Sequence, residues 1–379
     1  MTAGQGARQG PRVGEFVPYF HLPCGRNPTF HLGSMGGMWL VLYFHGSLAS
    51  PPNKAAYDLV RGQRTLFDDR DAAFFSASID PADAEERGMV EHDVGFRHFR
   101  DYYCGVSRGY GVLEGTVHRG TVFLVDRMLR VVQVEPASRM QSVLDRLRLE
   151  LAAERADTTP RFAPILTIPR IFEPEFCRAL IDYYEAVGGR ASGFMRQVDE
   201  RTVGVLDPAI KRRKDAYIEE GPLRTRACEL VSSRLIPAVS RAFGWRATRI
   251  ERYIVACYTA QDAGFFRRHR DNTTTGTAHR KFAVTINLNA DDYEGGELQF
   301  PEFGDRLYKP PTGGATVFAC GLLHEAKPVH RGVRYAFLPF LYDEAGKQLR
   351  EANKGSIVPV PGADEDPDED APAQTARAS

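Results

Sequence analysis

The sequence has few cysteines and no two of them at the short spacing of a zinc knuckle or a redox pair. None forms a CxxC motif, and the six are scattered along the 379 residues at Cys24, Cys104, Cys177, Cys228, Cys257 and Cys320. Isolated thiols of this kind are typical of a reducing compartment and not of a disulfide framework. We therefore expect most of them to be structural.

Long apolar runs and an excess of one charge are also missing. No run reaches the roughly 18 to 20 apolar residues that a membrane helix needs, and the N-terminal stretch MTAGQGARQGPRVGEF lacks the apolar segment of a signal peptide. Lys and Arg together number 49, as do Asp and Glu, so no basic excess indicates nucleic acid. The expectation is a cytoplasmic protein that binds neither membranes nor nucleic acids.

The length of the chain favours two domains, because 379 residues exceed what one ordinary core holds. In the first part, MWLVLYF (residues 38–44) and AAFFSASI (residues 72–79) are typical of strands that are buried on both faces, and the segment between them has helical spacing. Two further strands follow in GTVFLVDRMLRVVQVE. These patterns predict an α/β domain over residues 13–136.

A second domain is expected behind a break in the pattern. A charged helical segment and the stretch DTTPRFAP make a helix and linker over residues 137–160. Residues 161–350 carry two helical segments and then short strands that alternate in polarity between Gly, Pro and Asp, as in an antiparallel sandwich or barrel. Both ends, residues 1–12 and the acidic residues 351–379, are predicted to be disordered.

One group of residues in the second domain is typical of a metal site. In an extended strand, residues i and i+2 face the same way, so His269 and Asp271 in FFRRHRDN can meet at one point. His324 ends the run TVFACGLLH, and the turn KPVHRG lets Arg334 return beside it. Two histidines and a carboxylate suit ferrous iron, while a guanidinium suits a bidentate grip on a carboxylate. A structural zinc site is the alternative, but zinc prefers a closed set of four ligands with cysteines.

The neighbouring charged residues allow plainer interpretations. His279 and His330 are expected to be ordinary core or surface histidines and not ligands. Arg267, Arg268 and Arg270 form either a solvated strand face or contacts with an anionic or peptide substrate at the rim of a pocket, and the sequence leaves both open.

Residues 165–342 resemble the iron(II)- and 2-oxoglutarate-dependent dioxygenases, in particular the prolyl 4-hydroxylase-like catalytic domain. The matching motifs appear in family order: HRD at 269–271, TINLNADDYEGGELQF at 285–300, His324, and Arg334 within GVRY. The resemblance implies a double-stranded β-helix, or jelly roll, with Fe(II) on His269, Asp271 and His324. It also implies 2-oxoglutarate on Arg334, O₂ as the second co-substrate, and ascorbate as an added reductant. Tyr258 stands where the family often has a tyrosine that hydrogen-bonds 2-oxoglutarate.

The activity implied by this resemblance is hydroxylation of an unactivated C–H bond, with release of succinate and CO₂. The substrate is either a peptide or protein or a small molecule, and the motifs do not choose between them. The sequence also leaves a homodimer open.

Residues 13–136 resemble a peroxiredoxin or AhpC-like domain of the thioredoxin fold, through GEFVPYFHLP, FFSASID and HRGTVFLVD. That family has a peroxidatic cysteine at the start of the helix after the first long strand. Here the loop reads HGSLASPPN, with Pro51 and Pro52 at that position and no thiol. We therefore expect a redox-inactive domain that acts as a scaffold or binding surface. The alternatives are a thiol-dependent peroxidase working through this domain and a non-catalytic binding protein.

Overall fold

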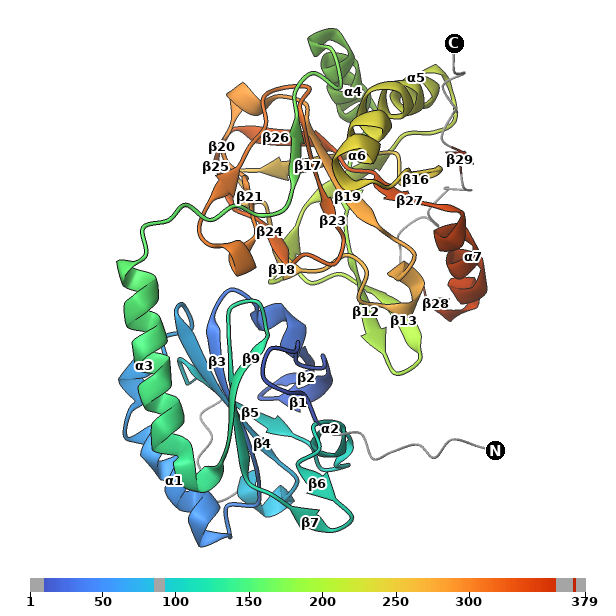
Figure 1. The fold of residues 1–379 in the computed structure, drawn as a ribbon. Helices are drawn as coiled ribbons and strands as arrows, with labels where there is room; N and C mark the ends of the chain where they lie inside the picture. Colours follow the sequence, from blue (N-terminus) through green and yellow to red (C-terminus); the bar gives the residue numbers. More distant parts are fainter. Residues whose placement is uncertain (1–9, 85–92, 359–370, 373–379) are drawn as a thin grey trace. The chain divides into compact units, whose positions relative to one another are not determined.

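The computed structural model describes residues 10–84, 93–358 and 371–372, and the chain divides near Phe162 into two compact units (Figure 1). Much of the predicted disorder, at residues 1–9, 359–370 and 373–379, lies outside the described residues. Among the described helices, none is long and apolar enough to cross a membrane.

The first unit is built on a seven-stranded mixed sheet. Its centre is the predicted βαβ arrangement, in which β3 (Trp39–Gly46) and β4 (Ala72–Ser78) pair in parallel and α1 (Pro51–Arg61) connects them. Every residue of both strands is buried, as their continuous apolar sequences require. The strand order is β2-β1-β5-β4-β3-β8-β9, with β1 (His21–Cys24), β2 (Asn27–His31), β5 (Phe96–Arg100), β8 (Thr121–Val125) and β9 (Val131–Pro136).

The helix α3 (Met140–Ala156), which the sequence analysis grouped with a linker, packs in the core of the first unit. Its apolar residues recur every three or four positions, and they join α1 on one face of the sheet (Figure 1). The buried members are Met140, Val143, Leu144, Leu147 and Leu151. The opposite face packs on residues around the short helix α2 (Gly105–Gly109). The first unit is therefore a thioredoxin-like fold, as expected, and it includes this helix.

The second unit contains two main antiparallel sheets, and this confirms the predicted jelly roll. The larger sheet runs β11-β15-β17-β26-β19-β27-β16-β29, and β23 and β10 extend it from β19. Its strands are β10 (Leu166–Ile168), β11 (Arg190–Ala191), β15 (Lys214–Tyr217), β16 (Arg249–Glu251), β17 (Ile254–Thr259), β19 (Phe282–Asn287), β23 (Ala315–Ala319), β26 (Val333–Phe337), β27 (Phe340–Tyr342) and β29 (Ala371–Pro372). The smaller sheet contains β14 (Lys211–Arg212), β18 (Phe265–His269), β24 (His324–Ala326), β21 (Leu298–Gln299) and β22 (Leu307–Tyr308).

The larger sheet has one apolar and one polar face. Val255, Val284, Val317 and Phe337 are among the residues that pack in a core with the helices α4 (Pro174–Val187), α5 (Pro222–Leu230) and α6 (Ile236–Phe243). Side chains alternate along a strand, so the residues between them point inward. Phe318, on β23, contacts His324 of the smaller sheet, with ring centroids 4.5 Å apart. The inward face therefore meets the sheet that carries the predicted ligands.

The C-terminal segment is ordered further than predicted. We expected disorder from residue 351, but α7 (Glu344–Asn353) continues to Asn353, and β28 (Ile357–Val358) pairs in parallel with β13 (Arg201–Val205). β13 forms a hairpin with β12 (Phe194–Val198). The prediction of disorder from residue 351 was wrong because the backbone of β28 forms hydrogen bonds with that hairpin.

Candidate active site

A β-bulge in β18 orients the side chain of His269 toward the site. In the pairing of β18 with β24, Phe266 lies opposite Ala326 and His269 opposite His324, so two residues of β18 face one residue of β24. A bulge of this kind turns a strand and re-aims its side chains. Phe266 and His269 consequently share a face although they are three positions apart, and their rings stack with centroids 3.5 Å apart.

The sequence predicted that His269 and Asp271 share one face of a continuous strand, and this prediction was wrong in its geometry. The strand ends at His269, and Asp271 lies beyond it, where its backbone N–H donates to the carbonyl of Cys320 at 2.9 Å. Asp271 is thus held by the segment that leads to His324 and not by continued strand alternation.

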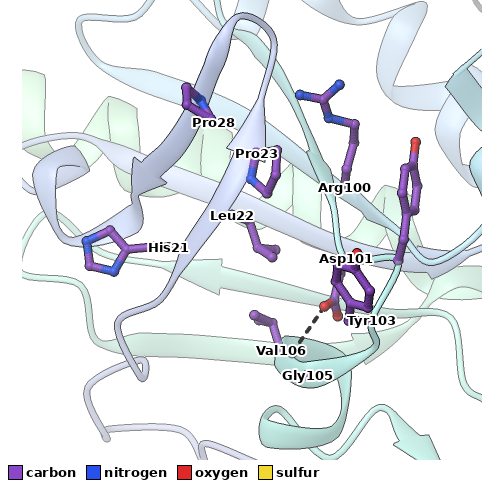
Figure 2. Close-up of a pocket in the computed structure, with 10 residues that line it drawn as sticks. His21, Leu22, Pro23, Pro28, Arg100, Asp101, Tyr103, Gly105 and Val106 are labelled. Carbon is purple, nitrogen blue, oxygen red and sulfur yellow. Dashed lines mark hydrogen bonds between the residues drawn. The ribbon is translucent and has the colours of Figure 1, made fainter. Parts of the chain in front are cut away.

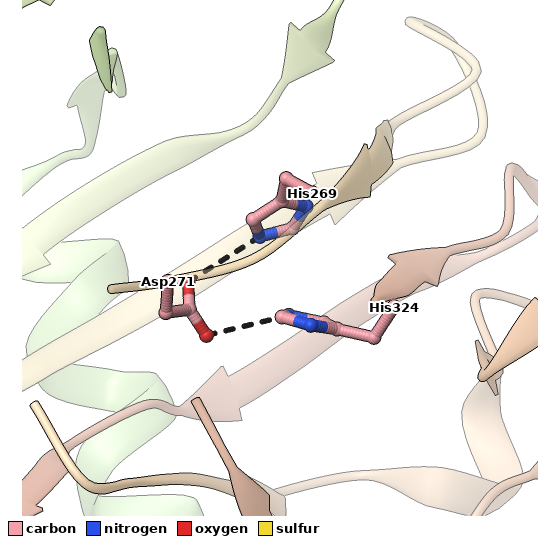
Figure 3. A group of neighbouring side chains, drawn as sticks. All are labelled: His269, Asp271 and His324. Atoms are coloured by element: carbon pink, nitrogen blue, oxygen red, sulfur yellow. Dashed lines mark ion pairs between the residues drawn. The ribbon is translucent and has the colours of Figure 1, made fainter. Parts of the chain in front are cut away.

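His269, Asp271 and His324 nevertheless converge (Figure 3). The Nε2 atom of His269 is 3.4 Å from Oδ1 of Asp271, and the Nε2 atom of His324 is 3.4 Å from Oδ2. One nitrogen or oxygen atom from each residue lies within 4.8 Å of the others. This is the spacing of atoms that surround one ion.

Hydrogen bonds fix which nitrogen of each ring faces this point. Nδ1 of His269 lies 2.7 Å from the carbonyl oxygen of Arg267, and Nδ1 of His324 lies 3.0 Å from that of Leu322. A carbonyl only accepts, so each Nδ1 carries the proton and donates it. Both Nε2 atoms then direct lone pairs at the carboxylate of Asp271. Three lone-pair donors with no proton between them fit a cation.

The protonation states agree with a metal site. Burial, and next the neighbouring His269, lower the pKa of His324 to about 4, so its ring is neutral at neutral pH. For Asp271, burial acts to raise the pKa, but His324 and His269 together hold it below its usual range. The site therefore offers the neutral imidazole of His324 and the carboxylate of Asp271, with the Nε2 atom of His269 directed at the same carboxylate. A donor set of nitrogen and oxygen with only three protein ligands fits ferrous iron with positions left for co-substrates.

The two other histidines lie outside this cluster. His279 is buried, and its Nε2 atom is 2.7 Å from the carboxylate of Glu251, which also accepts from Arg280 at 3.1 Å. His330 is exposed on β25 (Val329–Arg331). Neither belongs to the metal-competent group found among the described residues.

The structure places Arg334 and Tyr258 directly opposite each other on β26 and β17. Only 2% of Arg334 is exposed, and its Nε and Nη1 atoms are buried without a hydrogen-bond partner among the described residues. The guanidinium carbon lies 4.9 Å from the centre of the Tyr258 ring. A buried cation without an acceptor is costly, so this position fits an anionic ligand.

Further charged residues on this face were missed in the sequence analysis. Arg213 donates to the hydroxyl of Tyr258 at 3.4 Å and to Asp215 at 2.6 Å. Lys211 donates to Ser192 and lies 4.8 Å from the centre of the Phe266 ring. Burial, followed by the charge of Arg213, lowers the pKa of Lys211 well below its usual value. The stretch KRRKD was the signal that could have identified them, because Lys211, Arg213 and Asp215 stand two positions apart and can share one face.

The arginines around His269 have contacts within the fold. Arg267 donates to the carbonyl of Ala209 at 2.5 Å, and Arg270 donates to that of Gly321. Arg268 lies 3.7 Å from Glu325. These contacts favour the solvated strand face over the rim of the pocket.

The first unit has no thiol where a peroxidatic cysteine would stand. Pro51 and Pro52 begin α1, and the preceding loop is fixed by hydrogen bonds from Ser47 to Asp80 at 2.7 Å and from the backbone of Leu48 to Asp83 at 3.1 Å. A cavity of about 500 Å³ lies elsewhere in the unit, and no cysteine lines it (Figure 2). Its lining is His21, Leu22, Pro23, Pro28, Arg100, Asp101, Tyr102, Tyr103, Gly105 and Val106.

Comparisons with known proteins match both parts of the chain. Residues 253–342 match the profile of the 2OG-Fe(II) oxygenase superfamily, and residues 13–134 match that of the AhpC/TSA family. A PKHD-type hydroxylase of Synechococcus sp. (strain JA-2-3B'a(2-13)) is 32% identical over 97 residues, which cover 24% of this chain and 42% of that protein. A PKHD-type hydroxylase of Cupriavidus metallidurans is 24% identical over 186 residues, which cover 45% of this chain and 75% of that protein.

Solved structures resemble each part at low identity. A Pseudomonas putida prolyl-4-hydroxylase is 18% identical, with a TM-score of 0.36 over 51% of this chain and 98% of that one. A Plasmodium vivax 2-Cys peroxiredoxin is 15% identical, with a TM-score of 0.32 over 38% of this chain and 98% of that one. By its two profile matches, the chain joins a domain of the AhpC/TSA family to a domain of the 2OG-Fe(II) oxygenase superfamily.

Proposed function

We propose that the second unit is an Fe(II)- and 2-oxoglutarate-dependent hydroxylase, which oxidises an unactivated C–H bond of a peptide or small-molecule substrate. One observation carries the proposal. Two Nε2 lone pairs and the carboxylate of Asp271 converge at one point, and the buried guanidinium of Arg334 has no acceptor for Nε and Nη1 among the described residues. The match to the 2OG-Fe(II) oxygenase superfamily supports it.

In this proposal, His269, Asp271 and His324 hold the iron. Bound Fe(II), with 2-oxoglutarate and O₂, supplies the oxidant for the C–H bond, and succinate and CO₂ are released. The carbonyls of Arg267 and Leu322 hold the two rings in the ligand orientation through their Nδ1–H groups. The stacked ring of Phe266 limits rotation of His269.

Arg334 binds the far carboxylate of 2-oxoglutarate. A guanidinium presents its N–H groups in a plane that matches a carboxylate, and burial strengthens the attraction because water does not screen it. Ascorbate, which keeps the iron ferrous, is the reductant that belongs to this chemistry.

The test is succinate formation by the full chain with Fe(II), ascorbate and 2-oxoglutarate. We expect slow release of succinate without a prime substrate, and its loss on His324→Ala. His330→Ala is the matched control and keeps the wild-type rate, because that histidine is exposed and lies outside the cluster. Wild-type succinate release by His324→Ala would refute the ligand assignment.

The substrate class needs its own experiment. Pools of peptides and of small molecules are incubated with the full chain, and mass spectrometry detects products that gain one oxygen only when 2-oxoglutarate is present. The similarity to PKHD-type hydroxylases supports a hydroxylated product. A 2-oxoglutarate-dependent product without added oxygen would contradict hydroxylation.

A further inference from the structure

Two tyrosines flank Arg334, and their hydroxyl groups differ in what they already contact. The hydroxyl of Tyr258 accepts a hydrogen bond from Arg213 at 3.4 Å, and the guanidinium carbon of Arg334 lies over the Tyr258 ring, 4.9 Å from its centre. Tyr293 is 2% exposed, and its hydroxyl has no hydrogen-bond partner among the described residues. Buried hydroxyl groups nearly always have a hydrogen-bond partner, so this position suits a ligand that accepts a hydrogen bond.

Gly296 shows that Tyr293 and Arg334 are direct neighbours. A Cβ atom added to this glycine would lie 2.9 Å from Cδ of Arg334 and 3.3 Å from Cε2 of Tyr293. The backbone of Gly296 also has φ of +69°, which favours glycine. The second glycine of the GGEL motif therefore leaves room for the arginine and the tyrosine to lie side by side.

Lys309 fixes the position of the Tyr293 ring. Its Nζ atom lies 3.8 Å from the ring centre and donates to the carbonyl of Tyr293 at 2.7 Å. Burial raises the pKa of the Tyr293 phenol, and the nearby charge of Arg334 only partly offsets this, so the phenol keeps its proton at neutral pH. Tyr293 is thus a buried hydrogen-bond donor beside a guanidinium whose Nε and Nη1 atoms have no acceptor in the part of the chain that the structure describes.

We propose that Tyr293, and not Tyr258, donates the hydroxyl hydrogen bond to the far carboxylate of the 2-oxo acid that Arg334 binds. This inference rests on the proposed function. A carboxylate that Arg334 binds lies beside its N–H groups, in the plane of the guanidinium. The hydroxyl of Tyr258 already contacts Arg213, whereas the hydroxyl of Tyr293 has no hydrogen-bond partner among the described residues. Tyr258 is then a positioning residue. Its ring packs against the guanidinium of Arg334, and Arg213 donates a hydrogen bond to its hydroxyl.

The experiment titrates 2-oxoglutarate into the full chain loaded with Fe(II) without oxygen, and the visible absorption of the complex reports binding. We expect Tyr293→Phe to bind 2-oxoglutarate about 10- to 100-fold more weakly, as for a lost hydrogen bond to a charged group. Tyr258→Phe changes the affinity less than about threefold. Tyr183→Phe is the matched control, because its hydroxyl donates to the backbone of Tyr217 instead. Iron affinity stays the same in all three variants.

A second ligand distinguishes the loss of this one hydrogen bond from a general distortion of the binding site. 2-Oxopentanoate has the same chelating end but no far carboxylate, so it should bind wild-type protein and Tyr293→Phe equally. Equal weakening for both ligands, or weakening by Tyr258→Phe with wild-type affinity in Tyr293→Phe, would overturn the inference. Failure of the wild-type protein to bind 2-oxoglutarate at all would instead refute the proposed function, and this inference with it.

Discussion

At His269 and His324, two backbone carbonyls decide which ring nitrogen carries the proton. Because Arg267 and Leu322 accept from the Nδ1 atoms, the Nε2 atoms are left as ligands. Arg334 shows the complementary case, a buried side chain whose Nε and Nη1 atoms find no acceptor among the residues that the structure describes. The two Nε2 atoms fit a cation, and the guanidinium of Arg334 fits an anion. In the proposed function, the cation is Fe(II) and the anion is the far carboxylate of 2-oxoglutarate.

Arg334→Lys separates co-substrate binding from metal binding. Lysine keeps the charge but loses the fork of N–H groups, so we expect the KM for 2-oxoglutarate to rise by about tenfold while iron affinity stays near wild type. Steady-state succinate kinetics and an iron titration measure the two quantities. Loss of iron with an unchanged KM would make Arg334 a structural residue.

The cluster of Glu251 with Arg280 and His279 is a stability element beside the site. Burial acts to raise the pKa of Glu251, but Arg280 and His279 hold it well below its usual value of 4.5. A depressed carboxyl pKa stabilises the folded state above the unfolded pKa, and this stability is lost as the pH falls below about 4.5.

Glu251→Gln should therefore lower the free energy of unfolding by about 3 kcal/mol at pH 7, because it leaves Arg280 buried without its charge partner. The deficit should shrink as the pH is lowered below about 4.5, because Glu251 of the unfolded wild-type chain is then protonated while that of the folded protein is not. Urea unfolding at several pH values measures this. A deficit that stays constant down to pH 3 would argue against the pair.

At the scale of elements, the segment after Asp271 is held from two sides. The backbone of Thr275 and Gly276 donates to Gln197 and Thr202 of the β12–β13 hairpin, both at 2.8 Å, and Asn353 donates to the carbonyl of Thr275 at 2.8 Å. β28 in turn pairs with β13. The C-terminal segment thus supports the stretch that follows a proposed iron ligand.

Ending the chain after Ala352 removes Asn353 and β28, so residues 272–278 should exchange their amide hydrogens at least about fivefold faster, as expected when roughly 1 kcal/mol of local support is lost. A chain that ends after Val358 keeps both contacts and serves as the control. Hydrogen–deuterium exchange read by mass spectrometry provides the measurement. Equal protection in the two truncated chains would show that the segment is held by other contacts.

These elements also show how far the sequence alone could go. The βαβ unit was predictable because β3 and β4 are continuous apolar runs, and the motifs HRD, GGEL and GVRY predicted the strands that carry the proposed site residues. The bulge in β18 was not predictable, since hydrophobic alternation carries no sign of an extra residue. Tyr293 and the pairing of β28 were missed because they depend on contacts between segments far apart in sequence, which local patterns do not encode.

At the scale of the whole molecule, the chain combines a thioredoxin-like unit with a jelly roll, each with its own core. The sequence predicted boundaries at 13–136, 137–160 and 161–350. Because the apolar face of α3 lies in the core of the first unit, we propose to extend the first domain through α3 to about residue 160. A fold does not fix its function, and the first unit illustrates this.

The full chain is expected to show no thiol-dependent peroxidase activity. Peroxide reduction needs a reactive thiolate, and Pro51 and Pro52 occupy the start of α1. Cys24 is buried, and burial raises the pKa of its thiol. Peroxide consumption with dithiothreitol is the measurement, and loss of peroxide that disappears in Cys24→Ser or Cys104→Ser would establish the opposite.

The most direct test of the central claim is an equilibrium titration of the full chain with Fe(II) in the absence of oxygen. The account predicts one iron per chain in the wild-type protein and in His330→Ala. It predicts binding weakened by more than about tenfold in Asp271→Asn, which loses the only carboxylate of the set. Equal iron affinity in the wild-type protein and Asp271→Asn would contradict the claim that His269, Asp271 and His324 form the metal centre.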